Sequence, residues 1–123
     1  GKAMRMVFAN AGHNDPFVVR GPQTIPIVGE RSFPLGSSKR NVFSSSEFGF
    51  EAGDQLILYT DGLIEAEALD NQALGYSRFL AALPGLMGSS AEATEHSIRN
   101  WHRQMAKPGP QADDITVVVA KIG

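Results

Sequence analysis

The chain has 123 residues, of which 42% are hydrophobic and 20% are charged, and this composition is typical of one folded domain rather than a disordered segment. Its net charge is −2 and its Lys and Arg residues are scattered, which argues against nucleic acid as a partner. The chain has no cysteine, which excludes disulfides and thiolate metal sites. No apolar run approaches the roughly 18 residues of a membrane span, so we expect a cytoplasmic protein.

The first part of the chain has the patterns of β-strands. Residues 4–9 (MRMVFA) and 17–20 (FVVR) flank a segment dense in turn formers, and this pattern predicts a hairpin. The next run is TIPIV, residues 24–28. Because Pro26 has no N–H to give to a neighbouring strand, this run is predicted to be an edge strand or an extended loop.

A loop and two further strands follow. The loop RSFPLGSS contains Phe33 and Leu35, which we expect to reach into the core. Residues 41–50 (NVFSSSEFGF) have the pattern of a half-exposed strand. Residues 55–60 (QLILYT) are apolar on both faces and are therefore predicted to form a central strand.

Helical patterns occupy the next part of the chain. Helix formers follow Gly62 (LIEAEAL), and a short helix is predicted over residues 77–83, ended by a Pro-Gly pair. Ser89 and Glu92 have the spacing of a capping box. The amphipathic helix that follows repeats its apolar residues at spacings of four, three and four, with a core face of Thr94, Ile98, Trp101 and Met105.

The order of these elements predicts an α+β fold. The chain closes with a β-branched strand, DITVVVAKI (residues 114–122). Strands, then helices, then one strand favour a mainly antiparallel sheet with helices packed on one face, in a single domain over residues 1–123. Because the runs LILY and VVVA are apolar on both sides, a second sheet or a further segment should cover the opposite face.

Acidic residues lie where two of the predicted strands end or begin. Asp61 directly follows the strand that ends at Thr60, whereas Asp113 and Asp114 precede the last strand. If these strands are antiparallel neighbours, the carboxylates meet at one edge of the sheet; parallel strands would leave them about 20 Å apart. Gathered carboxylates repel unless a cation lies among them or one of them takes a proton; a hard divalent ion is the simplest remedy, and Mg²⁺ or Mn²⁺ prefers such oxygen ligands. Gly62 would let the backbone turn sharply beside the ion.

A purely structural interpretation competes with the metal site. Asp is a favoured N-cap residue, so Asp61 could cap a helix that starts at Leu63. Asp113 and Asp114 would then simply belong to a polar turn. From spacing alone, this structural role is the commoner outcome.

Three stretches together resemble one family. FANAGHNDPFVV (residues 8–19), GDQLILYTDGLIEA (53–66) and ADDITVVVAKI (112–122), with FPLG (33–36) between the first two, are similar to the later motifs of PPM-type metal-dependent serine/threonine phosphatases of the bacterial SpoIIE and RsbU kind. The resemblance implies an α-β-β-α sandwich, two Mn²⁺ or Mg²⁺ ions in the complete domain, and no catalytic residue beyond the metal ligands. It assigns Asp61 and Asp113 as those ligands, with Gly62 and Asp114 in supporting positions.

The chain departs from the family pattern at its beginning. The family's first half carries a D-x-x-G-H-G-like motif with a metal-bridging aspartate, and no such motif occurs here. The chain therefore resembles the C-terminal half of a phosphatase domain, and alone it is expected to bind metal weakly and to show little activity.

The resemblance also implies a reaction and partners. The parent reaction would be hydrolysis of phosphoserine or phosphothreonine on a protein by metal-activated water, without a phosphoenzyme. Substrates of the anti-sigma-factor antagonist type are implied. The expected partners are the missing N-terminal half of the domain or an upstream sensor or regulatory domain, and a homodimer is a further assembly to consider. The alternative function is a non-catalytic interaction or sensory domain that keeps the phosphatase scaffold.

Other catalytic assignments have less support. A haloacid dehalogenase-type phosphatase needs D-x-D-G-T, but Tyr59 occupies the position of the nucleophilic acid. The three histidines are expected to be surface or turn residues, because His96 and His102 point to different helix faces and His13 is remote in sequence. The serines of residues 44–46 lack the glycine frame of a nucleophile elbow.

Overall fold

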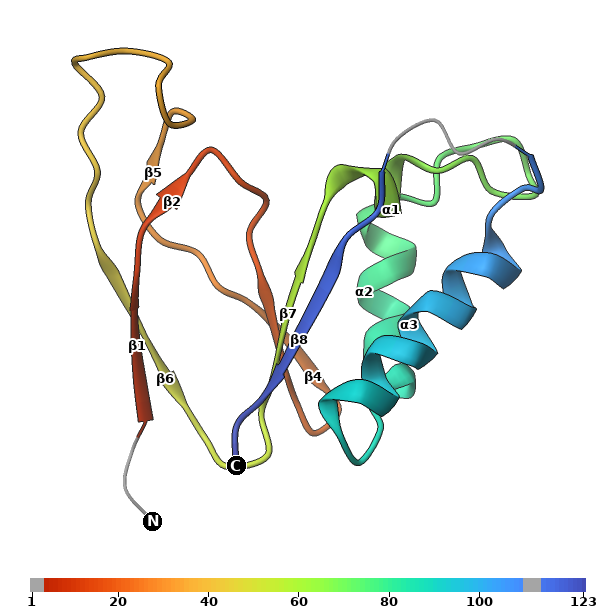
Figure 1. Cartoon of the computed structure of the whole chain (residues 1–123). Coiled ribbons are helices and arrows are strands. Elements are labelled where there is room, and N and C mark those ends of the chain that lie inside the picture. Colours follow the sequence, from red (N-terminus) through yellow and green to blue (C-terminus); the bar gives the residue numbers. More distant parts are fainter. Residues whose placement is uncertain (1–3, 110–113) are drawn as a thin grey trace.

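The centre of the molecule is a four-stranded antiparallel sheet with the order β4–β3–β7–β8 (Figure 1). The computed structural model describes residues 4–109 and 114–123. The strands of this sheet are β4 (Gln23–Pro26), β3 (Phe17–Arg20), β7 (Gln55–Tyr59) and β8 (Val117–Lys121). The prediction of β7 as a central strand is confirmed, and β4 lies at the edge, as its proline indicated.

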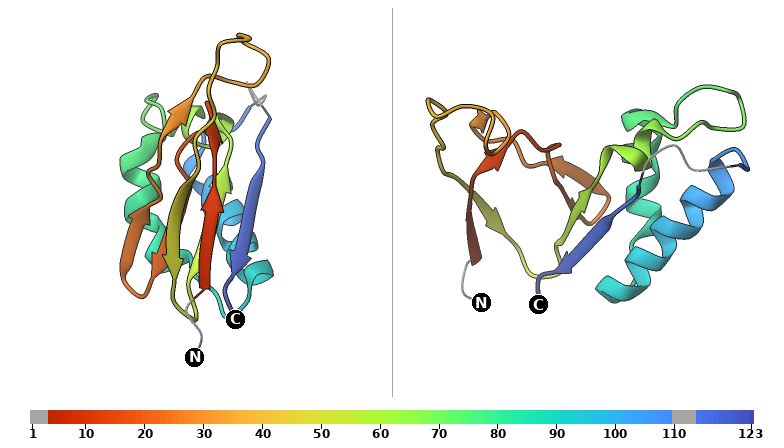
Figure 2. Two further views of the ribbon diagram at one scale, coloured as in Figure 1. Left: turned by 90° about the vertical axis from the view of Figure 1, so that its left-hand side faces the viewer. Right: turned by 45° about the horizontal axis from the view of Figure 1, so that its top comes forward.

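The first strand does not form the predicted hairpin with β3. It pairs instead with a strand some forty residues later, in the register Met4↔Phe50 to Phe8↔Ser46. These strands are β1 (Met4–Phe8) and β6 (Ser46–Phe50), and a short parallel pair follows from β2 (Asn10–Ala11) and β5 (Arg31–Ser32). The segment between β1 and β3 contains β2, which pairs with β5. The chain therefore passes from one sheet to the other between β1 and β3 instead of making a tight hairpin turn (Figure 2).

Helices cover one face of the four-stranded sheet (Figure 1). The helices are α1 (Asp61–Glu65), α2 (Gly75–Leu86) and α3 (Ala91–Met105). Helix α2 is longer than predicted and continues through Pro84 to Leu86, although a proline inside a helix lacks the N–H that would bond the carbonyl four residues before it. The cap of α3 is Ser90 rather than Ser89, since the Ser90 side chain accepts a hydrogen bond of 3.1 Å from the backbone N of Ala93. None of the helices in the described residues is long and apolar enough to cross a membrane.

An aromatic core fills the space between the sheet and the helices. The rings of Phe17 and Tyr59 are stacked with centroids 5.6 Å apart, and Phe79 from α2 meets Tyr59 edge to face at 5.2 Å. Phe79 is completely buried, which contributes about 1.5–3 kcal/mol relative to an exposed side chain. On α3, Thr94 and Ile98 are buried as the helical spacing predicted. This core holds β7 against the helices.

The loop between β5 and β6 extends away from this core (Figure 1). The prediction that Phe33 and Leu35 reach the core is wrong, because they are 72% and 77% exposed. The predicted strand over residues 41–50 is confirmed only for its second half, because β6 begins at Ser46. Asn41, which precedes β6, forms two hydrogen bonds with the backbone of Phe33 across this loop. Its Nδ2 donates to the Phe33 carbonyl oxygen at 2.7 Å, and its Oδ1 accepts from the Phe33 amide N at 3.3 Å.

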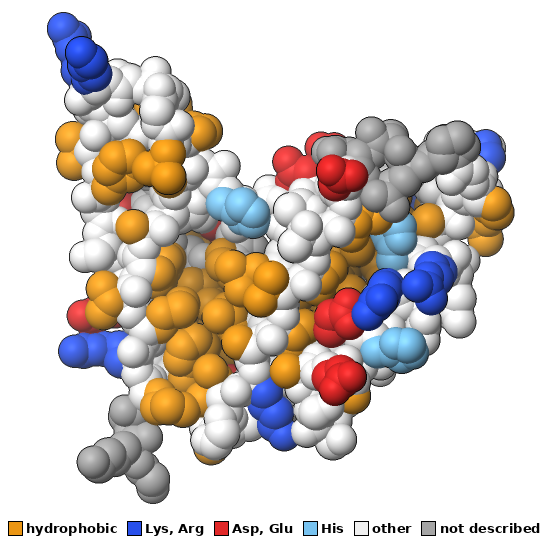
Figure 3. All heavy atoms as spheres, viewed as in Figure 1, with side chains coloured by type: hydrophobic (Ala, Val, Ile, Leu, Met, Phe, Trp, Pro, Cys, Tyr) orange, Lys and Arg blue, Asp and Glu red, His pale blue; other side chains and the backbone are white. Residues whose placement is uncertain are grey.

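The face of the sheet opposite the helices remains partly open. In β8 the side chains of Val117 and Val119 pack on the helix side, whereas Val118 points the other way and is 50% exposed. The β1–β6 ribbon stands apart from the sheet so that the two form a V (Figure 2), and hydrophobic side chains gather in the hollow between them (Figure 3). The predicted α+β class with antiparallel sheets is confirmed.

A buried ion pair closes the end of the sheet where β7 begins. Asp54, only 1% exposed, accepts hydrogen bonds from Arg20 at Nε (2.9 Å) and Nη2 (2.7 Å). It also accepts a bond of 2.9 Å from the backbone N of Glu51. The hydrogen bond from Arg20 is the main cause that lowers the pKa of Asp54 below its ordinary value. The pair therefore ties β3 to the turn before β7.

Replacing the cation of this pair should destabilise the fold strongly. In Arg20→Met, Asp54 would keep a buried charge without its partner, so we expect the free energy of unfolding in urea to fall by about 3 kcal/mol. Arg5→Met is the matched control, because the Arg5–Glu47 pair is 67% and 56% exposed and its loss should cost under about 1 kcal/mol. Equal losses in the two variants would contradict this role of Asp54.

The burial of the Tyr59 hydroxyl predicts how the stability of the fold changes at alkaline pH. This hydroxyl is buried without a hydrogen-bond partner in the described residues, and burial, aided by the nearby Tyr76 hydroxyl, raises the pKa of Tyr59. Above pH about 10 the unfolded chain loses this proton while the folded protein keeps it, so the free energy of unfolding should fall as pH rises. Urea unfolding at pH 8 and pH 11 should show a smaller fall for Tyr59→Phe than for the unsubstituted protein. The same fall in both would show that Tyr59 titrates normally.

Candidate metal-binding rim

The end of β7 and the beginning of β8 meet at one rim of the sheet. Tyr59 is opposite Val117 in the antiparallel register. The contact continues beyond the strands, because the backbone N of Thr60 donates to the Thr116 carbonyl at 3.0 Å and the Thr60 hydroxyl donates to the Asp114 carbonyl at 3.3 Å. The antiparallel arrangement that a shared acidic site requires is therefore present.

The predicted site residues are described to different extents. Asp61 is exposed at this rim as the first residue of α1. Asp114 lies beside Thr60 through its backbone. Asp113 lies outside the described residues, so its distance from Asp61 stays a prediction. Gly62 is buried within α1 and its φ is not positive, so the passage from β7 to α1 uses no glycine-only backbone conformation, and a close approach of Gly62 to an ion stays a prediction.

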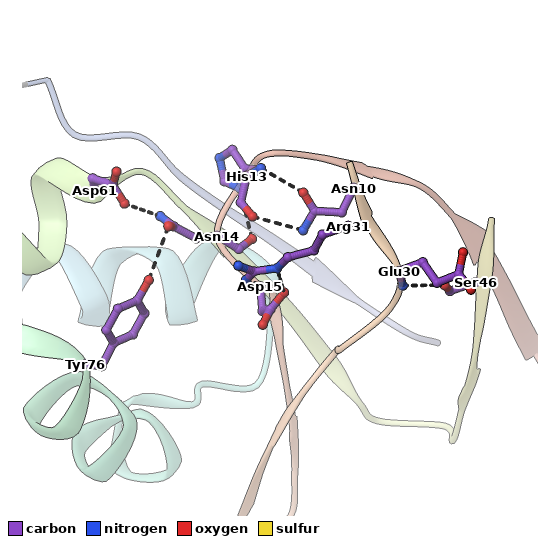
Figure 4. Close-up of polar contacts among 9 residues, drawn as sticks. All are labelled: Asn10, His13, Asn14, Asp15, Glu30, Arg31, Ser46, Asp61 and Tyr76. Atoms are coloured by element: carbon purple, nitrogen blue, oxygen red, sulfur yellow. Dashed lines mark hydrogen bonds and ion pairs between the residues drawn. The ribbon is translucent and has the colours of Figure 1, made fainter. Parts of the chain in front are cut away.

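The Asp61 side chain does not act as the helix cap that the structural alternative proposed. Helix α1 begins at Asp61 itself, with Thr60 in the N-cap position. The Asp61 carboxylate instead accepts a hydrogen bond of 2.5 Å from Nδ2 of Asn14, which belongs to the turn between β2 and β3 (Figure 4). A negative charge in the first turn of a helix is also electrostatically favourable.

The turn that carries Asn14 is held by its own side chains (Figure 4). The Asn10 amide forms two bonds with the backbone of His13, accepting from its N at 2.7 Å and donating to its O at 3.0 Å. Asp15 forms an ion pair of 2.7 Å with Arg31, the first residue of β5. The turn is thus fixed at both of its ends.

Helix α2 contributes a tyrosine to the same group of side chains. The Tyr76 hydroxyl donates to Oδ1 of Asn14 at 3.2 Å (Figure 4). Asn14 and Tyr76 were missed as candidates from the sequence. The signal for Asn14 was the turn run GHND within a stretch that resembles the phosphatase motif, but nothing in the sequence linked Tyr76 to Asp61.

The chemistry of the rim fits a hard divalent cation at a single carboxylate. Asp61 supplies oxygen ligands, it is exposed, and only its Oδ1 has a hydrogen bond among the described residues. However, residues 4–109 and 114–123 contain no group of three or more acidic or histidine side chains that could hold an ion. The described residues therefore do not form a closed metal centre by themselves.

His96 and His102 lie on α3, whereas His13 lies in the turn beside Asn14 (Figure 4), with its ring Nδ1 3.1 Å from the Asn14 carbonyl oxygen. One of the three differs from expectation. His13 and His96 are exposed, as predicted. The prediction that all three are surface or turn residues is wrong for His102, which is half-buried and whose Nε2 has no partner among the described residues. Burial lowers the pKa of His102. This residue belongs to the α3 side of the core rather than to the rim.

Solved structures similar to this chain include PP2C phosphatase domains. The SiaA-PP2C domain of Pseudomonas aeruginosa superposes with a TM-score of 0.79 at 19% identity, covering 97% of this chain and 47% of that chain. The PP2C phosphatase domain of SpoIIE from Bacillus subtilis, with a fragment of its regulatory domain, gives 0.73 at 22% identity, covering 94% and 33%. The RsbU and RsbW domains of a Mycobacterium tuberculosis protein give 0.69 at 22% identity, covering 94% and 31%.

Two facts qualify these similarities. The chain spans between a third and about half of the length of the two first solved chains, 33% and 47%. No curated protein matches it. The sequence profile described as Stage II sporulation protein E (SpoIIE), however, matches residues 2–123. The chain therefore belongs to the SpoIIE family.

Proposed function

We propose that this chain is part of a metal-dependent phosphatase domain that hydrolyses phosphoserine or phosphothreonine on a regulatory protein. The observation that carries the proposal is the exposed Asp61 carboxylate at the rim where β7 ends beside the start of β8. Membership of the SpoIIE family and the fold shared with PP2C phosphatase domains support it.

The metal ligands in this proposal are Asp61 and Asp113, with Gly62 and Asp114 in supporting positions. A bound Mn²⁺ or Mg²⁺ ion would neutralise the carboxylates and acidify a water for attack on phosphorus. A SpoIIE phosphatase domain soaked with manganese is among the solved structures of similar fold, which favours Mn²⁺ as the first ion to test. No side chain of the described rim is offered as a nucleophile.

The rest of the domain is proposed to cover the open apolar face. Val118 and the hollow between the β1–β6 ribbon and the sheet (Figure 3) present hydrophobic surface that a second half of the domain would bury. The chain also spans only part of its solved relatives. We therefore expect a second set of metal ligands from outside residues 1–123, and weak or absent activity for this chain alone.

The substrate class is proposed to be a phosphorylated anti-sigma-factor antagonist in the cytoplasm. One similar structure combines RsbU and RsbW domains, and another joins the phosphatase domain to part of a regulatory domain. Both support a place in regulated signalling, with an upstream sensor or regulatory domain as a partner of this chain. A homodimer is a further assembly that sedimentation would test.

The competing function is a non-catalytic interaction domain on the same scaffold. The observation in its favour is that no group of three acidic or histidine side chains occurs within the described residues. In that case Asp61 would hold the turn through Asn14 and would never bind an ion. Upstream sequence with an acid-Gly-His-Gly motif after a strand would favour the enzyme.

An assay of matched proteins tests the proposal. We expect the 123-residue chain to release little phosphate from phosphoserine and phosphothreonine peptides with Mn²⁺, and the same chain in its natural protein to release it at least a hundredfold faster. Asp61→Ala and Asp113→Ala should each remove that activity, because each deletes an ion ligand. Glu65→Ala, an exposed acid on α1, is the control and should leave activity unchanged.

Two results would decide against the enzyme. Natural protein without Mn²⁺-dependent phosphate release would favour the interaction domain. Full activity in Asp61→Ala would show that the rim is not the metal site.

A further inference from the structure

A chain of hydrogen bonds leads from helix α2 to the Asp61 carboxylate (Figure 4). The Tyr76 hydroxyl donates to Asn14, and Asn14 donates to Asp61. These three residues come from separate elements: the start of α2, the turn between β2 and β3, and the first position of α1. Two hydrogen bonds thus link three parts of the chain and end on one oxygen of the Asp61 carboxylate.

Chemistry fixes the orientation of the Asn14 amide. An ionised carboxylate can only accept hydrogen bonds, so the NH₂ group of Asn14 must face Asp61. The carbonyl oxygen then faces Tyr76, whose hydroxyl can donate. Both contacts require the same orientation, so each bond supports the other.

The backbone around Asn14 is equally constrained. On one side the Asn10 amide bonds both backbone groups of His13, and on the other Asp15 is paired with Arg31. The backbone at Asn14 therefore cannot move away from Asp61 without breaking contacts that do not involve Asp61, and the hydrogen bond from Tyr76 holds the side chain. The donor is fixed before any ligand arrives.

This arrangement contributes little to the stability of the fold. The Asn14–Asp61 and Tyr76–Asn14 bonds are solvent-exposed, so water competes for the same donors and acceptors and the net contribution of each bond to stability is small. The core around Phe79 packs without either bond. The two bonds hold Oδ1 of Asp61 in place, whereas its Oδ2 has no partner among the described residues.

We propose that Asn14 is a positioning residue for Asp61 and that Tyr76 acts on Asp61 through Asn14. This inference rests on the proposed function, in which Asp61 is a metal ligand. By holding Oδ1, Asn14 pre-orients the carboxylate so that binding an ion costs less conformational freedom. Residues that orient a metal ligand typically change metal affinity 10- to 100-fold when they are replaced.

The test measures Mn²⁺ binding without substrate, by the electron paramagnetic resonance signal of free Mn²⁺, on the natural protein that contains this chain. Asn14→Ala should weaken Mn²⁺ binding about tenfold. Tyr76→Phe, which keeps the ring contact with Tyr59, should weaken it about threefold. Because Tyr76 acts through Asn14, the double variant should bind no more weakly than Asn14→Ala alone.

Asn41→Ala is the matched control. Asn41 also bridges two groups at a partly exposed position, but it contacts only the backbone of its own loop. Its replacement should leave Mn²⁺ binding unchanged. The melting temperatures of the four substituted proteins should stay within a few degrees of the unsubstituted one, since none of these bonds is buried in the core.

Asp61→Ala separates failure of this inference from failure of the proposed function. If Asp61→Ala abolishes Mn²⁺ binding while Asn14→Ala binds normally, positioning by Asn14 is wrong and the metal site stands. If Asp61→Ala itself binds Mn²⁺ normally, the metal role of Asp61 is wrong and the inference falls with it. Additive losses from Asn14→Ala and Tyr76→Phe would contradict the route through Asn14.

Discussion

The antiparallel pairing of β7 with β8 is the interaction on which the rest of the structure depends. It runs from Gln55 opposite Lys121 to Tyr59 opposite Val117. On one face this pairing places Ile57 and Tyr59 beside Val117 and Val119, where the helices complete the core. Where β7 ends, the pairing brings the residues that follow β7 next to the residues that precede β8. The same strand pairing therefore positions both the core side chains and the acidic rim.

Strand β7 has a carboxylate at each end, and the surroundings give the two acids different roles. Asp54 precedes the strand, is buried and is neutralised by Arg20. Asp61 follows the strand, is exposed and, within residues 4–109 and 114–123, has an amide rather than a cation as its partner. A buried acid with a cation serves the fold, whereas an exposed acid oriented by a neutral donor keeps its charge available for an ion.

Local pattern was enough to predict some features of this molecule. The apolar run of β7, the proline of β4 and the spacing of Thr94 and Ile98 each express one physical preference, and each led to the observed element. The pairing of β1 with β6 was not predictable in this way, because no local signal states which distant strand completes a ribbon. Likewise, Phe33 and Leu35 are apolar but exposed, since their loop extends past the sheet.

The candidate site likewise contains one residue that local sequence could identify and two that it could not. Asp61 could be singled out because an acid at a strand end is visible in sequence. Asn14 and Tyr76 could not, because their relation to Asp61 exists only after the turn, α1 and α2 have come together. The placement of Asp113 remains a sequence prediction, and with it the second carboxylate of the proposed centre.

A crystal of the natural protein grown with Mn²⁺, with diffraction recorded at an energy where manganese scatters anomalously, tests the central claim most directly. The account predicts an anomalous peak about 2.1–2.2 Å from a carboxylate oxygen of Asp61 and from one of Asp113, at the rim between β7 and β8. Well-ordered Asp61 and Asp113 side chains that point apart, with no anomalous peak between them, would contradict it.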